Sequence, residues 1–127
     1  MARILIVDDS TLTRKAISRI IEMTNLEVDE VIEATNGREA LQKLQGGGID
    51  LVLADLNMPE MGGIEMIYHM ASDETIQHIP VVVISTESST TRIEGLLSNG
   101  AKNYLHKPFT PEQVKDVIEQ TLGVSNS

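Results

Sequence analysis

The sequence contains no cysteine, few basic residues and no long apolar run. Without cysteine, neither a disulfide framework nor a thiolate metal site can form. The apolar runs are about as long as strands and far shorter than the roughly 20 residues that cross a bilayer. The N-terminus also lacks the apolar region of a secretory signal peptide. We therefore expect a cytoplasmic protein that inserts into no membrane.

Lysine and arginine together number 10, against 19 aspartates and glutamates, which gives a formal net charge of −9. Nucleic acids and anionic membrane surfaces are bound through clusters of basic residues. The sequence contains no such cluster. We therefore predict that nucleic acid is not a direct partner.

The chain has 127 residues, of which 41% are hydrophobic, and this is typical of one domain with a substantial core. Apolar and β-branched runs predict strands at residues 4–7, 28–34, 51–54, 81–84 and 102–105, each followed by a helix. Strands that alternate with helices predict an α/β fold with right-handed crossovers. We expect a doubly wound, five-stranded parallel sheet, (βα)5, with the flavodoxin-like strand order 2-1-3-4-5.

The spacing of apolar residues also predicts the buried face of each helix. In the first helix, which is expected to begin at Ser10 or Thr11, Arg14 and Lys15 fall on the predicted exposed face. The residues expected on buried faces are Leu12, Ala16, Ile17, Ile20 and Ile21 in the first helix, Ala40, Leu41 and Leu44 in the second, Ile64, Ile67, Met70 and Ala71 in the third, Ile93, Leu96 and Leu97 in the fourth, and Val114, Val117, Ile118 and Leu122 in the fifth.

Polar residues follow four of the five predicted strands. Asp8 and Asp9 follow the first, Asp55 follows the third, Ser85 follows the fourth and Lys107 follows the fifth. The end of the second strand, residues 33–35, offers no comparable group. Asp55 alone would also fit a simple turn cap. Because parallel strands end at the same edge of a sheet, where ligands bind, the set predicts one acidic site.

Two carboxylates about 4 Å apart repel by about 4 kcal/mol at an effective dielectric constant near 20. Three of them therefore require counter-charges, one of which Lys107 supplies. Oxygen ligands without cysteine or a well-placed histidine suit Mg²⁺, or Mn²⁺ as the alternative ion. Such a site, with Lys107 and the Ser85 hydroxyl, can hold a transferring phosphoryl group, with Asp55 as its acceptor.

Four motifs occur in the order and on the strands found in the receiver domains of two-component response regulators: Val7-Asp8-Asp9, Asp55-Leu56-Asn57-Met58-Pro59, Ser85, and Lys107-Pro108-Phe109. The resemblance extends over about residues 3–122. It implies a single receiver domain over residues 1–127, without an output domain.

The resemblance implies that a histidine kinase phosphorylates Asp55, which becomes a 4-aspartylphosphate. Asp8, Asp9, Asp55 and the backbone carbonyl of Asn57 would bind Mg²⁺. Ser85 and Lys107 would contact the phosphoryl oxygens, and the Lys107–Pro108 peptide bond would be cis. A receiver of this kind is not an enzyme in the usual sense, because it catalyses only its own phosphorylation and autodephosphorylation.

Asn57, Glu87 and Tyr104 match the stand-alone, CheY-like chemotaxis receivers, whereas Gly62 stands where the family usually has Asp or Asn. The resemblance implies a switch in which phosphorylation draws Ser85 inward and Tyr104 turns toward the vacated space. The surface formed by the fourth helix, the fifth strand and the fifth helix would then change shape. We expect a monomer that binds a downstream protein, with the flagellar motor switch as one candidate.

Three other functions are compatible with parts of this pattern. A metal-dependent phosphatase with an aspartyl-phosphate intermediate shares the chemistry, although such enzymes generally place the nucleophile after the first strand. A flavodoxin-like flavin protein shares the fold, but Asp8 and Asp9 would repel its phosphate. A constitutive interaction module would not need Asp9, Asp55, Ser85 and Lys107. His69 and His78 have no third ligand at metal spacing and are expected at the surface.

Overall fold

The computed structural model describes residues 2–123, in which five strands alternate with five helices. The elements are β1 (Ala2–Val7), α1 (Thr11–Met23), β2 (Val28–Ala34), α2 (Gly37–Gln45), β3 (Leu51–Asp55), α3 (Gly63–Ala71), β4 (Val81–Ser85), α4 (Thr90–Ser98), β5 (Asn103–His106) and α5 (Pro111–Leu122). None of the helices between residues 2 and 123 has the length and apolar character needed to span a bilayer.

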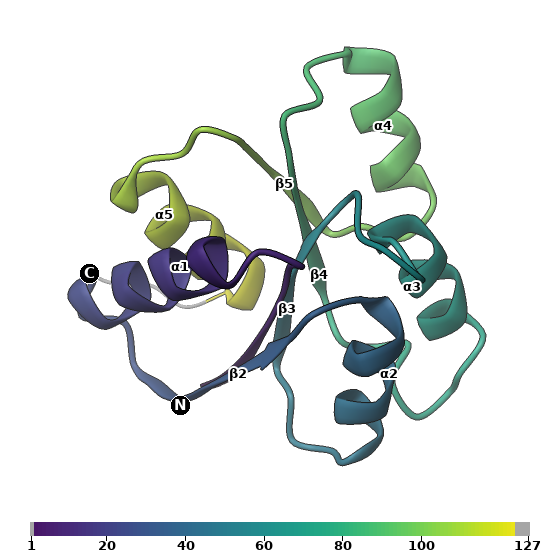
Figure 1. Ribbon diagram of the computed structural model, residues 1–127, viewed down its shortest axis with the longest axis horizontal. Helices are drawn as coiled ribbons and strands as arrows, with labels where there is room; N and C mark the ends of the chain where they lie inside the picture. Colours follow the sequence, from purple (N-terminus) through teal and green to yellow (C-terminus); the bar gives the residue numbers. More distant parts are fainter. Residues whose placement is uncertain (1, 124–127) are drawn as a thin grey trace.

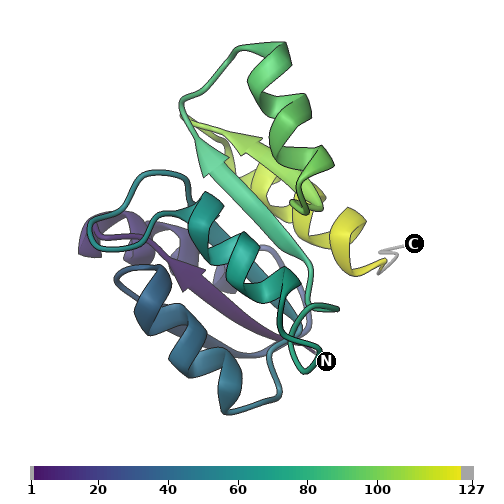
Figure 2. The ribbon, with the colours of Figure 1, turned by 90° about the vertical axis from the view of Figure 1, so that its right-hand side faces the viewer.

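The five strands form one parallel sheet in the order β2-β1-β3-β4-β5, which confirms the predicted fold. Helices α1 and α5 cover one face of the sheet, and α2, α3 and α4 cover the other (Figure 1). In Figure 2 the arrows of β1 and β4 point in the same direction. The carboxyl ends of the strands therefore lie along one edge.

The central strands supply side chains to both faces of the sheet. Ile4 and Ile6 of β1 pack in the cluster under α1 and α5, whereas Leu5 and Val7 pack in the cluster under the other three helices. This is the two-residue alternation of a strand that is covered on both sides. It explains why the central strands read as continuous apolar runs.

The predicted buried face of α1 is partly wrong. Leu12 is 82% exposed and Ala16 is also exposed, whereas Arg14 is only 9% exposed. The inward face is set by Ile17 and Ile21, and Arg14 precedes them by three and seven residues, so it lies on the same face. Leu12 precedes Ile17 by five residues and therefore lies on another side of the helix.

Two other helices depart from prediction in the same way. In α3 the buried apolar side chains are Met66, Ile67 and Met70, while Ile64 and Ala71 are exposed. In α4 only Leu96 is buried, and Leu97 is 41% exposed. Short helices with apolar residues on several sides permit more than one choice of face, and the packing against the sheet decides between them.

The first loop of the site is shaped by the way in which α1 begins. Ser10 is the N-cap, and its Oγ accepts a hydrogen bond from the Thr13 amide at 3.2 Å. An N-cap side chain satisfies an amide that has no partner within the helix. The cap therefore ends the β1–α1 loop only two residues after Asp8.

The corrected face of α1 predicts unequal effects of two alanine substitutions. We expect Ile17→Ala to lower the free energy of unfolding by about 2–5 kcal/mol, because Ile17 is buried and its truncation leaves a cavity. Leu12→Ala should change it by less than about 0.5 kcal/mol, because Leu12 is exposed. Urea unfolding followed by circular dichroism measures both, and equal losses would contradict the observed face.

Candidate functional site

The predicted polar groups meet at the carboxyl edge of the sheet. The register aligns Val7 of β1 with Ala54 of β3, so Asp8 and Asp55 follow directly on neighbouring strands. Lys107 follows β5, and its amide donates to the Ser85 carbonyl at 2.8 Å. The backbone thus brings groups that are about a hundred residues apart in the chain to one place.

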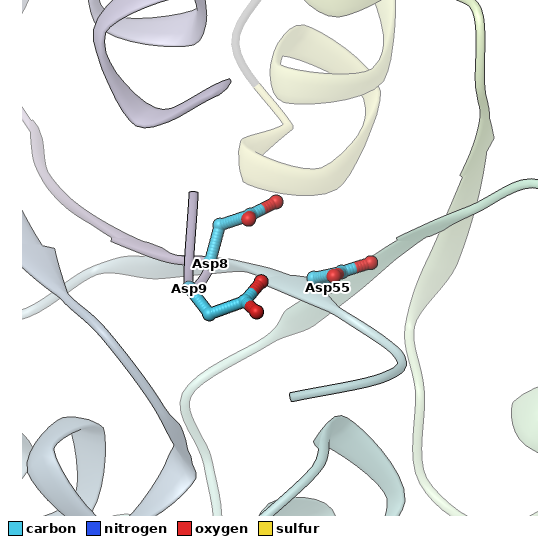
Figure 3. A group of neighbouring side chains, drawn as sticks. All are labelled: Asp8, Asp9 and Asp55. Carbon is cyan, nitrogen blue, oxygen red and sulfur yellow. The ribbon is translucent and has the colours of Figure 1, made fainter. Parts of the chain in front are cut away.

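Three carboxylates form the centre of the site. Asp8, Asp9 and Asp55 each offer one oxygen, and these oxygens lie within 4.8 Å of one another. Figure 3 shows the three side chains reaching into the same space from the ends of β1 and β3. Asp8 is almost fully buried, Asp55 is half-buried and Asp9 is exposed, so the cluster is open to solvent on the side of Asp9.

Lys107 is the cation that faces this cluster. Its Nζ lies 3.3 Å from Asp55 Oδ1 and 3.5 Å from Asp8 Oδ2. One ammonium against three carboxylates leaves a formal excess of two negative charges. Several carboxylate oxygens with an unbalanced negative charge are the environment that a hard divalent cation such as Mg²⁺ prefers.

Asp55 is held through one of its two carboxylate oxygens. Oδ1 accepts the Lys107 ammonium and also the Leu56 amide, at 3.0 Å. Residues 2–123 give Oδ2 no hydrogen-bond partner. Burial raises the pKa of the Asp55 carboxyl above its ordinary value of 3.8; the Lys107 ammonium partly offsets this, and the Asp8 carboxylate adds to it.

Ser85 and Asn57 lie beside the acidic cluster and make no hydrogen bond to it within the described range. Ser85 ends β4, is 4% exposed, and its Oγ accepts the Glu87 amide at 3.1 Å. Asn57 is exposed in the loop two residues after Asp55. The Lys107–Pro108 bond is cis, as the resemblance implied.

Tyr104 joins β5 to the loop that follows β4. Its hydroxyl donates to the Ser85 carbonyl at 3.1 Å and to the Glu87 carbonyl, and its ring packs partly buried against the core on the α2–α4 face. Burial raises the pKa of the Tyr104 hydroxyl. In this structure the Tyr104 hydroxyl thus contacts the end of β4 and the loop that follows it. The Glu87 carboxylate forms an ion pair with Arg92, whose side chain is 76% exposed, so this pair contributes little to the stability of the fold.

Glu33, at the end of the second strand, is connected to the site indirectly, through Arg14. Glu33 Oε1 lies 2.9 Å from Arg14 Nε, and Arg14 Nη1 donates to the carbonyl oxygen of Asp8 at 2.6 Å. The spacing of Arg14 from Ile17 and Ile21 was the signal that places it on the inward face.

The three histidines, His69, His78 and His106, are exposed.

Gly62 occupies the N-cap of α3 without a side-chain cap. A Cβ atom at this position would lie 2.8 Å from the carbonyl oxygen of Leu56. The loop that follows Asp55 turns too closely on itself for a larger residue in this conformation. The usual Asp or Asn would therefore require a shifted loop.

A family model described as the response regulator receiver domain matches residues 4–119. The chain is 36% identical to the chemotaxis protein CheY1 of Helicobacter pylori over 125 residues, which are 98% of this chain and 99% of that protein. It is 34% identical to the chemotaxis protein CheY of Pseudomonas aeruginosa over 118 residues, covering 93% of this chain and 94% of that protein.

Solved structures give the same result at the level of the fold. The chemotaxis response regulator CheY4 of Vibrio cholerae superposes with a TM-score of 0.86 at 33% identity, covering 96% of this chain and 99% of that chain. A putative response regulator from Chloroflexus aurantiacus superposes with a TM-score of 0.87 at 22% identity, covering 96% of this chain and 98% of that chain. At 22% identity, the likeness to the Chloroflexus aurantiacus protein supports the fold and not the function.

The raised pKa predicts that Asp55→Asn stabilises the metal-free protein at neutral pH. A folded-state pKa above the unfolded value means that ionised Asp55 destabilises the fold at any pH above both values, and that this penalty is absent below 3.8. Urea unfolding in the presence of a chelator, from neutral pH down to about pH 4, should show a gain that shrinks as the pH falls. Asp116→Asn, at an exposed site on α5, is the control. An Asp55→Asn variant that is less stable than wild type at neutral pH would contradict the raised pKa of Asp55.

Proposed function

Because the chain belongs to the response regulator receiver family, we propose that it is a phosphorylation-dependent switch of chemotaxis signalling in which Asp55 accepts a phosphoryl group from a histidine kinase. The observation that carries the proposal is the cluster of Asp8, Asp9 and Asp55 at the carboxyl edge of the sheet, with Lys107 against Asp8 and Asp55. The names of the chemotaxis relatives support the pathway.

The donor set fits a Mg²⁺ ion, because it consists of oxygens and has an excess of negative charge. Asp8, Asp9, Asp55 and the backbone carbonyl of Asn57 would hold the ion, and Mn²⁺ would suit the same ligands. Bound there, the ion would offset negative charge on the phosphoryl oxygens. The exposure of Asp9 leaves one side of the site open for the ion and its waters.

Asp55 is suited to be the nucleophile. An oxygen of its carboxylate attacks phosphorus, a P–O bond forms, and the P–N bond of the donor phosphohistidine breaks, leaving the electron pair on the imidazole nitrogen. The Asp55 Oδ1 is already bound by Lys107 and the Leu56 amide, which orients the carboxylate. The chain thus acts as substrate and catalyst of its own modification.

Two other groups are placed to receive the transferred phosphoryl group. Lys107 Nζ can move from the carboxylates to a phosphoryl oxygen and neutralise part of its charge. Ser85 Oγ accepts the Glu87 amide, and this leaves its own hydroxyl hydrogen available to donate. Attack of water on phosphorus would break the P–O bond to Asp55, release inorganic phosphate, restore the carboxylate and end the signal.

The signal leaves the site through Ser85 and Tyr104. Movement of Ser85 toward the phosphoryl group alters the loop whose carbonyls accept the Tyr104 hydroxyl. The surface formed by α4, β5 and α5 then changes its affinity for a downstream protein, with the flagellar motor switch as one candidate. We propose that the protein acts as a monomer.

Asp55→Asn should abolish phosphorylation by acetyl phosphate and Mg²⁺. The amide is a poor nucleophile and a weaker metal ligand, so the rate should fall at least on the order of a hundredfold. Intact-mass spectrometry should show one added phosphate on wild type and on the exposed-site control Asp116→Asn, and none on Asp55→Asn. A phosphate that maps to Asp8, or that persists in Asp55→Asn, would rule out this assignment.

Tyr104→Phe should weaken the coupling between phosphorylation at Asp55 and the surface formed by α4, β5 and α5. The substitution keeps the ring but removes the one hydroxyl hydrogen that the Ser85 and Glu87 carbonyls share, which is worth about 1 kcal/mol, or about fivefold in an equilibrium. NMR shifts of α4 and α5 on adding beryllofluoride should therefore shrink, while the mimic still binds at Asp55. His106→Ala, at an exposed site on the same strand, is the control. Equal shifts in Tyr104→Phe and wild type would show that the hydroxyl has no part in the output.

A further inference from the structure

Arg14 is a buried cation that the proposed phosphotransfer does not use. Its side chain retains only 10% of its exposure, although it carries a full charge. Removing a guanidinium from water is costly unless its donors find acceptors. Arg14 meets this requirement with the Asp8 carbonyl at 2.6 Å, Glu33 Oε1 at 2.9 Å and Thr11 Oγ1 at 3.2 Å.

The contact with Asp8 fixes the backbone from which two of the three carboxylates project. The Asp8 amide donates to the Ala34 carbonyl at 3.1 Å, while Arg14 is the only hydrogen-bond donor that residues 2–123 give to the Asp8 carbonyl. That carbonyl and the Asp9 amide belong to one planar peptide unit. Holding the carbonyl therefore fixes the direction in which the Asp9 main chain continues.

The Asp9 carboxylate depends on this backbone more than its neighbours do. Asp8 is anchored through its side chain, since Oδ1 accepts the Ser10 amide at 2.8 Å, and Asp55 is anchored by Lys107 and the Leu56 amide. Asp9 is exposed, and its side chain makes no hydrogen bond within residues 2–123. Only the orientation of its peptide unit directs it toward the other two carboxylates.

We propose that Arg14, anchored by Glu33, is a positioning residue for the divalent cation site: its guanidinium orients the Asp8–Asp9 peptide so that the Asp9 carboxylate faces Asp8 and Asp55. Glu33 also neutralises the positive charge of Arg14, which would otherwise repel a divalent cation bound by the three carboxylates. The inference rests on the proposed function, in which this cluster binds Mg²⁺.

The chain provides a matched control pair. Arg3 of β1 and Glu30 of β2 form another Arg–Glu bridge, with Arg3 Nη2 2.8 Å from Glu30 Oε1. Glu30 precedes Glu33 by three residues on β2, and Arg3 lies near the amino end of β1, away from the acids. Substitution of Arg3 thus removes an Arg–Glu bridge to the same strand, β2, without touching the Asp8 carbonyl.

The test measures Mg²⁺ binding to the unphosphorylated protein by isothermal titration calorimetry, with thermal unfolding of the metal-free protein in parallel. We expect Arg14→Gln to raise the Kd for Mg²⁺ on the order of tenfold, as loss of a group that orients a metal ligand does. Arg14→Lys keeps the charge but lacks the planar fork of donors with which Arg14 spans Glu33 and the Asp8 carbonyl. The Kd of this variant for Mg²⁺ should lie between the values for wild type and Arg14→Gln. Arg3→Gln should bind Mg²⁺ as wild type does.

A second readout separates positioning from stability. The amide NMR signals of Asp9 and Ser10 in the metal-free protein should shift in both Arg14 variants and stay in place in Arg3→Gln. If Arg14→Gln does not fold, Arg14→Lys decides. An unchanged Kd in the folded Arg14 variants, whatever their thermal stability, would overturn the inference. Wild-type protein that binds no Mg²⁺ would instead overturn the proposed function.

Discussion

Three carboxylates at one edge of the sheet repel one another, and the contacts around the site offset this repulsion. Each pair of charges within 4.8 Å repels by about 3–4 kcal/mol at an effective dielectric constant near 20. Against this, Ile4, Leu5, Ile6, Leu51, Val52 and Leu53 are completely buried on the two strands that deliver the acids. Each buried side chain contributes about 1.5–3 kcal/mol, and this helps the fold to hold a charge cluster that the free side chains would avoid.

The same constraint explains why the cations around the site differ in kind. Lys107 is a flexible ammonium that lies against two of the acids, so it can be transferred to an incoming anion. Arg14 is a planar guanidinium whose donors are used by a backbone carbonyl and a carboxylate outside the cluster. Under the two proposals, Lys107 would exchange partners during phosphotransfer, while Arg14 would hold the β1–α1 loop in place.

The fold and the main site residues were predictable because they follow from local rules. Continuous β-branched runs such as Val81–Ile84 indicate covered parallel strands, and such strands end at a common edge, which places Asp8, Asp55 and Lys107 together. The errors came from helix faces, as Leu12 and Arg14 show, because an apolar residue was assumed to be buried and a charged one exposed. The contact between Arg14 and the Asp8 carbonyl depends on tertiary packing that hydrophobic spacing does not reveal.

One backbone atom connects the acidic site to the surface. The Ser85 carbonyl accepts both the Lys107 amide at 2.8 Å and the Tyr104 hydroxyl at 3.1 Å. The Ser85 side chain is buried, and its Oγ accepts the Glu87 amide. A displacement of Ser85 would therefore strain the contacts of Lys107 and Tyr104 together, since two donors share one acceptor. In a close-packed interior such shared contacts favour two discrete arrangements over a gradual one. Under the proposed function, this shared acceptor would couple a charge added at Asp55 to the contacts of Tyr104 on β5.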